Sequence, residues 1–300
     1  MPSLSALGFV PTPAMWIAAA LTLLPLLLAG FVPKRFAGMV ERLPPTVRIV
    51  APGLLCIPYA MVVRPRELVH LGWLLLYAVV PIAIAWMLRQ AKLADRSQRG
   101  SWRDFLVLTL LGLAVDLRWL ERAWPAHLAI FSKMILLDAG IYGFLFIRQL
   151  DGVGFDLLLR RRDVVTGVRE FVWYTPIAVV LGLWLRFLHV HAVVPRVSTV
   201  LFAYVFTFLF IAIPEELFFR GWLQNLLERR LGRWPALLLT SVLFGLSHFN
   251  KRAVHFNWRY VVLATIAGFF YGRAWRAQRR VGASAITHAC VDTVWSQWLR

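Results

Sequence analysis

Six ionisable side chains in the last third of the chain fall inside or beside long apolar runs. In chain order, they are Glu215, Glu216, Arg220, His248, His288 and Asp292. An ionisable side chain inside a bilayer costs at least about 2.5–3.5 kcal/mol on insertion scales, so each one needs a compensating role. We therefore take these six residues as candidates for a functional site.

The spacing within PEELFFRGWLQ, residues 214–224, gives the two adjacent glutamates different roles. Glu216 and Arg220 are four residues apart, which on a helix places them one turn apart and able to form an ion pair. Glu215 then points about 100° away, toward another neighbour. Pro214 removes a backbone donor, so we expect it to break or kink the helix and to make room for water or substrate.

A turn at LGRWP, residues 231–235, is expected to join two antiparallel helices. Glu215 and His248 lie at similar sequence distances on either side of this turn, which corresponds to roughly 20 Å along each helix. They should therefore lie at a similar depth. His288 and Asp292, in THACVD, are four residues apart and share one face of the last predicted helix. Three helices can thus direct polar side chains into one cavity.

This set of side chains suits the activation of water. A glutamate and a histidine can take a proton from water as it attacks a carbonyl carbon and can return it to the leaving amine. The pair of His288 and Asp292 can stabilise the oxyanion that forms. The four residues Glu215, His248, His288 and Asp292 could equally bind a zinc ion, so the spacing alone leaves both kinds of hydrolysis open.

The elements that must position these residues are predicted to be membrane-spanning helices. The chain has 300 residues, of which 60% are apolar, and its mean hydropathy is +0.67. Lipid offers backbone groups no hydrogen-bond partners, and continuous rather than alternating apolar runs favour helices over a closed barrel. The net charge is +18, but the basic residues lie mostly between the apolar runs, where they face phosphate headgroups. This pattern excludes nucleic acid as a favoured partner.

The apolar runs predict an all-α fold, a polytopic transmembrane bundle of about eight to ten spans. We place ten spans near residues 11–32, 46–63, 67–88, 103–120, 126–147, 171–191, 197–219, 236–250, 258–275 and 283–299. The charged sequence between the fifth and sixth runs combines leucines with arginines and predicts an interfacial amphipathic segment. The expected organisation is an N-terminal bundle of unknown role at 1–150, this basic segment at 151–170 and a catalytic core at 171–300.

Three short sequences in the second half resemble the motifs of a known protease family. EELFFR, FGLSH and HACVD are similar, in order, to the EExxxR, FxxxH and HxxxN/D motifs of the CPBP family. These are the CAAX-processing and bacteriocin-processing intramembrane proteases, also called Abi proteins. The segment FFYGRAW is similar to one that this family carries before its last motif. The resemblance covers roughly residues 171–300.

The resemblance implies an intramembrane endopeptidase of helical fold that cleaves near the membrane. It implies that Glu215 and His248 activate water, and that His288 and the residue at 292 form the oxyanion site. Glu216 and Arg220 would then support the site structurally. The residue at 292 is Asp here, whereas prenyl-protein members carry Asn, and an ionised aspartate cannot donate to an oxyanion. Asp292 must therefore be protonated, orient His288 or bind a cation.

The leading hypothesis is an endopeptidase of the glutamate type that needs no cofactor, and the alternative is a zinc enzyme. Its partners would be the lipid bilayer and a membrane-embedded or lipid-linked protein or peptide substrate. We expect a multi-pass integral membrane protein, with a bacterial inner membrane as its location. Two other classes stay open. One is a proton- or ion-coupled transporter, in which the polar residues form a relay. The other is a catalytically silent, immunity-type scaffold.

Overall fold

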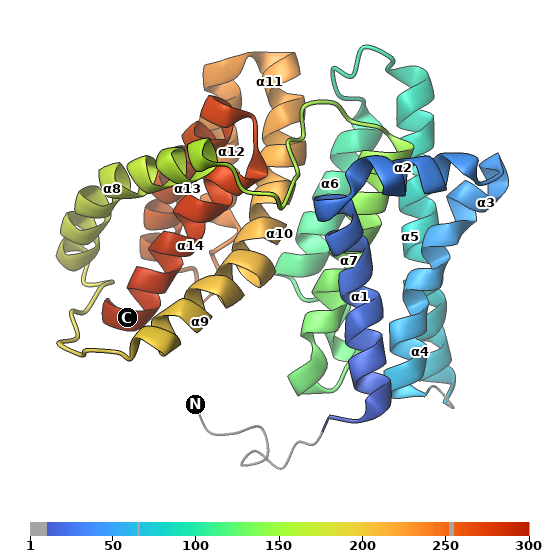
Figure 1. Cartoon of the computed structure of the whole chain (residues 1–300), viewed down its shortest axis with the longest axis horizontal. Helices are drawn as coiled ribbons and strands as arrows, with labels where there is room; N and C mark the ends of the chain where they lie inside the picture. Colours follow the sequence, from blue (N-terminus) through green and yellow to red (C-terminus); the bar gives the residue numbers. More distant parts are fainter. Residues whose placement is uncertain (1–10, 65–66, 252–254, 300) are drawn as a thin grey trace. The chain divides into compact units, whose positions relative to one another are not determined.

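The computed structural model describes residues 11–64, 67–251 and 255–299, and these residues form helices and connecting segments without a strand (Figure 1). The chain divides into two compact units. The first comprises the chain up to Ala94 together with Thr109–Gln149, and the second comprises Asp95–Leu108 together with the chain from Leu150 onward. The predicted all-α fold is confirmed.

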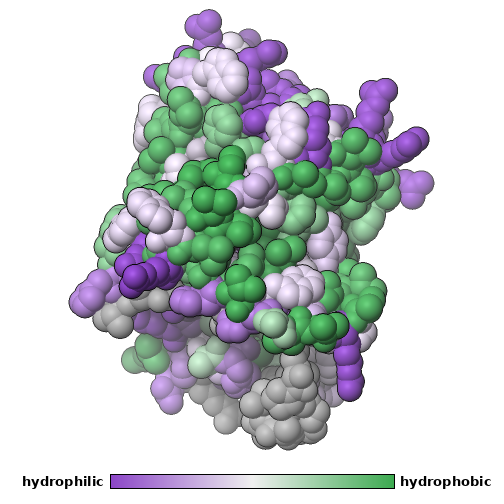
Figure 2. All heavy atoms as spheres, turned by 90° about the vertical axis from the view of Figure 1, so that its left-hand side faces the viewer, coloured by the Kyte–Doolittle hydropathy of each residue, from purple (hydrophilic) through white to green (hydrophobic). Residues whose placement is uncertain are grey.

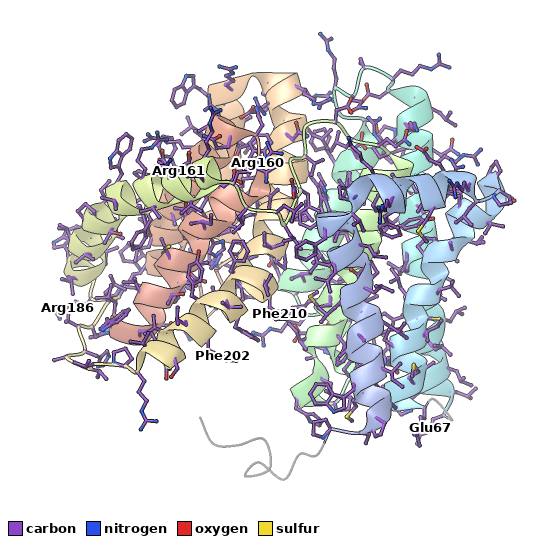
Figure 3. The ribbon with its side chains drawn as sticks, viewed as in Figure 1. Glu67, Arg160, Arg161, Arg186, Phe202 and Phe210 are labelled. Atoms are coloured by element: carbon purple, nitrogen blue, oxygen red, sulfur yellow. The ribbon has the colours of Figure 1, made fainter. Side chains whose placement is uncertain are left out.

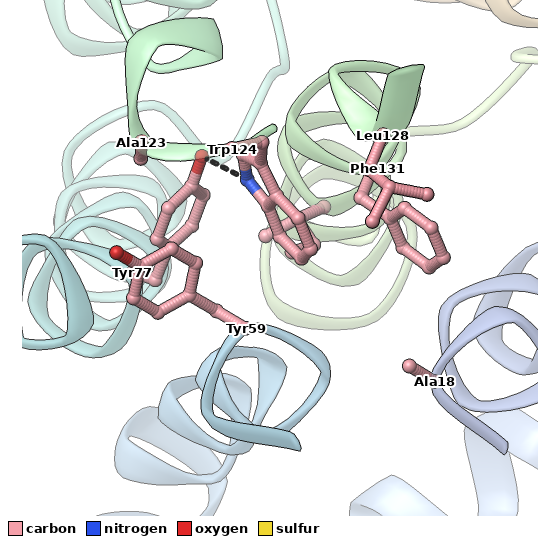
Figure 4. Packing of buried hydrophobic residues seen from close by; sticks show 8 residues of the cluster. Ala18, Tyr59, Tyr77, Ala123, Trp124, Leu128 and Phe131 are labelled. Atoms are coloured by element: carbon pink, nitrogen blue, oxygen red, sulfur yellow. Dashed lines mark hydrogen bonds between the residues drawn. The ribbon is translucent and has the colours of Figure 1, made fainter. Parts of the chain in front are cut away.

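The helices of the first unit surround a core that is rich in aromatic residues. They are α1 (Pro13–Phe31), α2 (Pro33–Arg42), α3 (Pro45–Val50), α4 (Ile57–Val63), α5 (Leu68–Ala94) and α7 (Ile130–Ile141), while α6 (Trp102–Asp116) runs from the second unit into the first. Tyr59, Tyr77 and Trp124 pack edge to face or stacked in this core, and the Trp124 ring nitrogen donates to the Tyr77 hydroxyl at 2.7 Å (Figure 4). The hydrogen bond satisfies the polar ends of two large rings inside an apolar cluster.

The second unit contains the six candidate residues. Its helices are α8 (Arg161–Trp184), α9 (Val197–Thr207), α10 (Ile213–Glu216), α11 (Asn225–Leu231), α12 (Arg233–Leu246), α13 (Trp258–Gln278) and α14 (Val281–Trp298). The last helix, α14, packs against α8, α9 and α13, and α12 packs along α13. Because most residues in the first half of α14 are buried, its side chains face other helices rather than the surroundings.

The expected turn at residues 231–235 is confirmed. Gly232 adopts a positive φ of 83° between the end of α11 and the start of α12, a conformation that glycine reaches without strain. Pro235 lies in the first turn of α12, where backbone N–H groups have no partner within the helix, so a proline there costs no hydrogen bond. The turn therefore reverses the chain and brings α12 back alongside the preceding helix.

Pro214 does not break its helix, but the helix bends in this region, which agrees with the second of the two expected outcomes. The helical run from Val197 to Leu231 is continuous over 35 residues, and Figure 1 shows it bending between α9 and α11. Two π-helical stretches, Phe208–Ala212 and Leu217–Gln224, flank the short α-helical segment that contains Pro214. The wider π turns relieve the clash between the proline ring and the preceding turn without ending the helix, and such turns often occur at functional sites.

Six helices in the described part of the chain are long and apolar enough to cross a membrane, fewer than the ten spans that we expected. They are Pro13–Phe31, Pro45–Val63, Leu68–Ala94, Ala126–Ile147, Arg161–Trp184 and Val197–Leu231. The helix α6 has 15 residues and α12 has 14, which at about 1.5 Å per residue is less than the roughly 30 Å of a bilayer core. The last two helices are long enough but less apolar, because α13 carries several arginines and α14 carries site residues and small polar residues. The protein is an integral membrane protein.

Arginines lie beyond both ends of α8, as expected for a spanning helix. Figure 3 shows Arg160 and Arg161 where α8 begins and Arg186 beyond its other end. The face that Figure 2 presents is hydrophobic over most of its middle, with hydrophilic side chains above and below. Exposed apolar side chains such as Val172 and Val180 would be costly in water and are stable against lipid.

The predicted basic segment at 151–170 comprises a connecting segment and the start of α8. Residues 161–170 are the first turns of α8, and they are held inside the second unit by buried carboxylates. The Arg280 guanidinium donates to both carboxylate oxygens of Asp163, at 3.0 and 2.9 Å, and to Asp156 at 2.9 Å. Charges in this segment thus pair across helices, and its interfacial location stays a prediction.

Candidate functional site

A fully buried ion pair lies at the base of the candidate site. The Arg220 Nε atom is 3.2 Å from the Glu216 carboxylate, and neither side chain has any exposed surface. The same guanidinium donates to the Gly268 carbonyl oxygen at 2.9 Å and lies 4.7 Å from the centre of the Phe244 ring. The pairing that the four-residue spacing predicted is therefore confirmed, and two further contacts fix the arginine.

His288 connects this ion pair to the other carboxylates. Its Nδ1 is 2.9 Å from the Glu216 carboxylate, so Nδ1 carries the proton and donates. Its Nε2 faces Asp292 at 3.5 Å and Glu215 at 3.9 Å. The imidazole is 3% exposed, whereas Glu215 and Asp292 are 27% and 29% exposed. A buried imidazole thus presents one nitrogen toward two accessible carboxylates.

His248 is held by the backbone of its own helix end. Its Nδ1 is 2.8 Å from the Phe244 carbonyl oxygen and 3.2 Å from the Ser247 hydroxyl. A carbonyl oxygen can only accept, so Nδ1 carries the proton and the neutral ring keeps a lone pair on Nε2. The Tyr260 ring packs edge-on against the imidazole at 4.7 Å. His248 is therefore oriented as an acceptor of a proton or of a hydrogen bond from water.

Phe244 joins the two histidines into one cluster. Its ring centre lies 4.9 Å from that of His248 and 5.7 Å from that of His288. The Tyr271 ring stacks on His288 at 4.6 Å, with an angle of 16° between the planes. The structure thus joins the six predicted residues in one cluster: the Phe244 ring contacts Arg220, His248 and His288, and the three carboxylates lie near His288.

Two residues of this cluster were not singled out from the sequence. The Lys251 ammonium is 3.7 Å from the Glu215 carboxylate, and the Tyr271 ring stacks on the His288 ring. Lys251 is three residues beyond His248, a spacing that places both near one helix end. Tyr271 belongs to FFYGRAW, the segment noted only for its resemblance. The spacing of Lys251 from His248 and the place of Tyr271 in FFYGRAW can be read from the sequence, but only the folded chain shows what these side chains contact.

Small residues allow the helices to approach closely enough for these contacts. A Cβ atom on Gly245 would lie 1.9 Å from the Thr265 hydroxyl oxygen and 2.6 Å from the Val261 carbonyl oxygen. A Cβ atom on Gly268 would lie 3.3 Å from the Arg220 guanidinium. Glycine at these two positions of α12 and α13 therefore sets the distance between the helices that carry the site.

An open pocket extends from the histidines into an apolar part of the second unit. His248, His288 and Asp292 form its polar part, and its volume is about 80 Å³. The apolar lining comes from α8, α13 and α14 and includes Tyr174, Ala264, Ala267, Val291 and Trp295. Glu215 is not among the described residues that line it, although its carboxylate lies near the His288 ring. The pocket can therefore take an apolar group and place its end beside the candidate residues.

The zinc alternative rests on the same residues. Among the described residues, no three His, Cys, Asp or Glu side chains are arranged to hold a metal ion. His288 also uses Nδ1 to donate to Glu216, which leaves Nε2 as its single nitrogen for other partners. As folded here, the four residues predicted as ligands do not converge on one point, and we derive no step through zinc.

The family model described as type II CAAX prenyl endopeptidase Rce1-like matches residues 197–294. This stretch runs from the first residue of α9 into α14 and contains all six candidate residues. No curated protein and no solved structure matches the chain.

Proposed function

Because residues 197–294 are an Rce1-like domain of the type II CAAX prenyl endopeptidase (CPBP) family, we propose that this protein is an intramembrane endopeptidase that hydrolyses a peptide bond with water activated by Glu215 and His248. The observation that carries the proposal is the contrast between adjacent glutamates. Glu216 is fully buried in an ion pair, whereas Glu215 is 27% exposed beside the Nε2 atom of a buried imidazole. One carboxylate is available for chemistry and the other is not.

Glu215 would act as the general base. It takes a proton from water while the water oxygen attacks the carbonyl carbon, and His248 Nε2 accepts a hydrogen bond from the same water. The Lys251 ammonium, 3.7 Å from Glu215, keeps positive charge beside the carboxylate. When the tetrahedral intermediate collapses, the C–N bond breaks and Glu215 returns the proton to the leaving amine.

His288 would stabilise the oxyanion. A proton on its Nε2 can be donated to the substrate oxygen as negative charge develops there. Asp292, at 3.5 Å from Nε2, would orient the His288 ring. An aspartate can fill this role at the position where the prenyl-protein members of the family carry asparagine. Glu216 and Arg220 hold the other side of the ring, so the imidazole needs no reorganisation during the reaction.

The substrate would be a membrane-associated or lipid-linked protein. The small, open apolar pocket beside the histidines would receive an apolar side chain or the end of a lipid chain close to the scissile bond. The matching family is named for prenylated CAAX proteins, so a prenylated CAAX peptide is the first probe. A bacterial inner membrane is our proposed location.

The test is peptide cleavage by the purified full-length protein in lipid, measured by mass spectrometry. The substrates are a prenylated CAAX peptide and a mixed library of membrane proteins and lipopeptides. We compare wild type with Glu215→Gln, an isosteric change that removes the base but keeps the shape, each with and without a strong chelator. We expect cleavage by wild type that survives chelation and falls by about 10²–10⁴-fold in the variant.

The other outcomes distinguish the alternatives. Cleavage that chelation abolishes and zinc restores would replace the glutamate mechanism with the metal mechanism. Unchanged cleavage by Glu215→Gln would refute the assignment of the base. Absence of cleavage of every probe, combined with ion flux that depends on Glu215, would favour the transporter. Absence of both would favour the silent scaffold.

A further inference from the structure

A second recess, separate from the candidate active site, lies where helix ends meet in the second unit. It is lined by Arg169, Glu170, Arg233, Trp234, Arg273, Arg276, Ala277 and Arg279. These come from the first half of α8, the start of α12 and the end of α13, and the recess has a volume of about 320 Å³. We call this set of residues the arginine pocket.

A buried carboxylate holds two of the arginines from the α8 side. The Glu170 side chain is 1% exposed, and its oxygens lie 2.8 Å from an Arg169 nitrogen and 3.3 Å from Arg273 Nε. The Trp173 ring lies under both guanidinium groups, at 5.4 Å from Arg169 and 4.9 Å from Arg273. These contacts fix the direction of both side chains before any ligand binds.

A second carboxylate holds the arginines on the other side. Glu228 is 5% exposed and lies 3.4 Å from Arg276 and 2.7 Å from Arg279. The Arg276 guanidinium also lies 4.9 Å from the Trp234 ring centre. Five arginines thus face two carboxylates, so the pocket keeps an excess of three positive charges.

Exposed aromatic and apolar side chains flank the excess charge. Trp173 and Trp234, beside the pocket, are 49% and 60% exposed, as is typical of aromatic residues at a membrane interface. Val172 of α8 and Leu238 of α12 are also exposed and begin the apolar surfaces that continue along these helices.

We propose that the arginine pocket binds the phosphate of an anionic phospholipid headgroup. Guanidinium groups match phosphate geometry through paired hydrogen bonds, and basic pockets between membrane helices bind such headgroups. A free phosphate ion offers the same chemistry, but it has no acyl chains to bury against the exposed valine and leucine side chains below the pocket. The observations therefore favour the lipid.

The test measures which lipids stay bound to the full-length protein. The purified protein is incubated with equimolar phosphatidylcholine and phosphatidylglycerol in detergent, and bound lipids are identified by native mass spectrometry. The pocket variant carries Arg169→Gln, Arg233→Gln and Arg279→Gln. The matched control carries Arg161→Gln, Arg162→Gln and Arg186→Gln, exposed arginines outside the pocket, and loses the same net charge (Figure 3).

We expect wild type and control to retain phosphatidylglycerol and the pocket variant to retain about tenfold less. Equal loss of bound phosphatidylglycerol from the pocket variant and the control would overturn the proposal, because it would show diffuse attraction of the lipid to a basic surface. Complete displacement of the lipid by inorganic phosphate would also overturn it, because the ligand would then be the free ion. If the triple variant melts early in phosphatidylcholine alone, Arg233→Gln replaces it, and unchanged lipid retention by that variant would refute the proposal.

Discussion

Replacing Glu216 by glutamine separates a structural glutamate from the adjacent candidate base. Glu216 and Arg220 have no exposed surface, and the variant leaves the Arg220 charge buried without a carboxylate. Removing one partner of a buried pair costs about 3–5 kcal/mol. For a unit of this size, each kcal/mol lowers Tm by roughly 2–4 °C, so we expect a fall of about 10 °C.

The matched comparison is Glu215→Gln. Glu215 is 27% exposed, and its partner Lys251 is 34% exposed, so solvent screens this ion pair. Such pairs contribute about 0–1 kcal/mol, so Tm should change by no more than roughly 2–4 °C. Activity should follow the opposite order when measured below both melting temperatures, with the greater loss in Glu215→Gln.

The assay is thermal unfolding of the purified protein in one lipid or detergent, followed by peptide cleavage at a temperature where all variants are folded. A double variant, Glu216→Gln with Arg220→Met, should regain part of the lost stability because it removes the unpaired charge as well. If Glu215→Gln lowered Tm more than Glu216→Gln, the assignment of the two carboxylates would be reversed and our reasoning refuted.

Three further predictions test the surroundings of the site. Gly245→Ala should lower Tm by several degrees, because the added Cβ would lie 1.9 Å from the Thr265 hydroxyl and force the helices apart. The control is Gly38→Ala, whose added Cβ would meet no atom within 4 Å and should not lower Tm. His248→Gln should reduce cleavage by about 10²-fold or more, and near-normal rates would remove His248 from the mechanism. Lys251→Met should reduce cleavage by less than about tenfold, because its pair with Glu215 is partly exposed, and a loss above about 100-fold would make the ammonium essential.

The sequence by itself determined the fold class and which neighbouring side chains can meet on one helix. Apolar runs without alternation can satisfy the backbone in lipid only as helices, so the all-α fold followed. The four-residue spacing from Glu216 to Arg220 and from His288 to Asp292 is local, and one helical turn brings each pair together whatever the rest of the chain does. The turn at Gly232 is local as well.

Only the tertiary structure decided which side chains meet across helices. No spacing relates His288 to Glu216, yet their contact at 2.9 Å distinguishes the buried glutamate from the accessible one. The structure has six helices that are long and apolar enough to span, against about ten predicted, because α12 has only 14 residues and α14 carries polar side chains that face other helices. The π turns around Pro214 depend on how a long helix adapts to its neighbours. Contacts between residues distant in the chain depend on how the helices of the second unit pack together, and no short stretch of sequence specifies that packing.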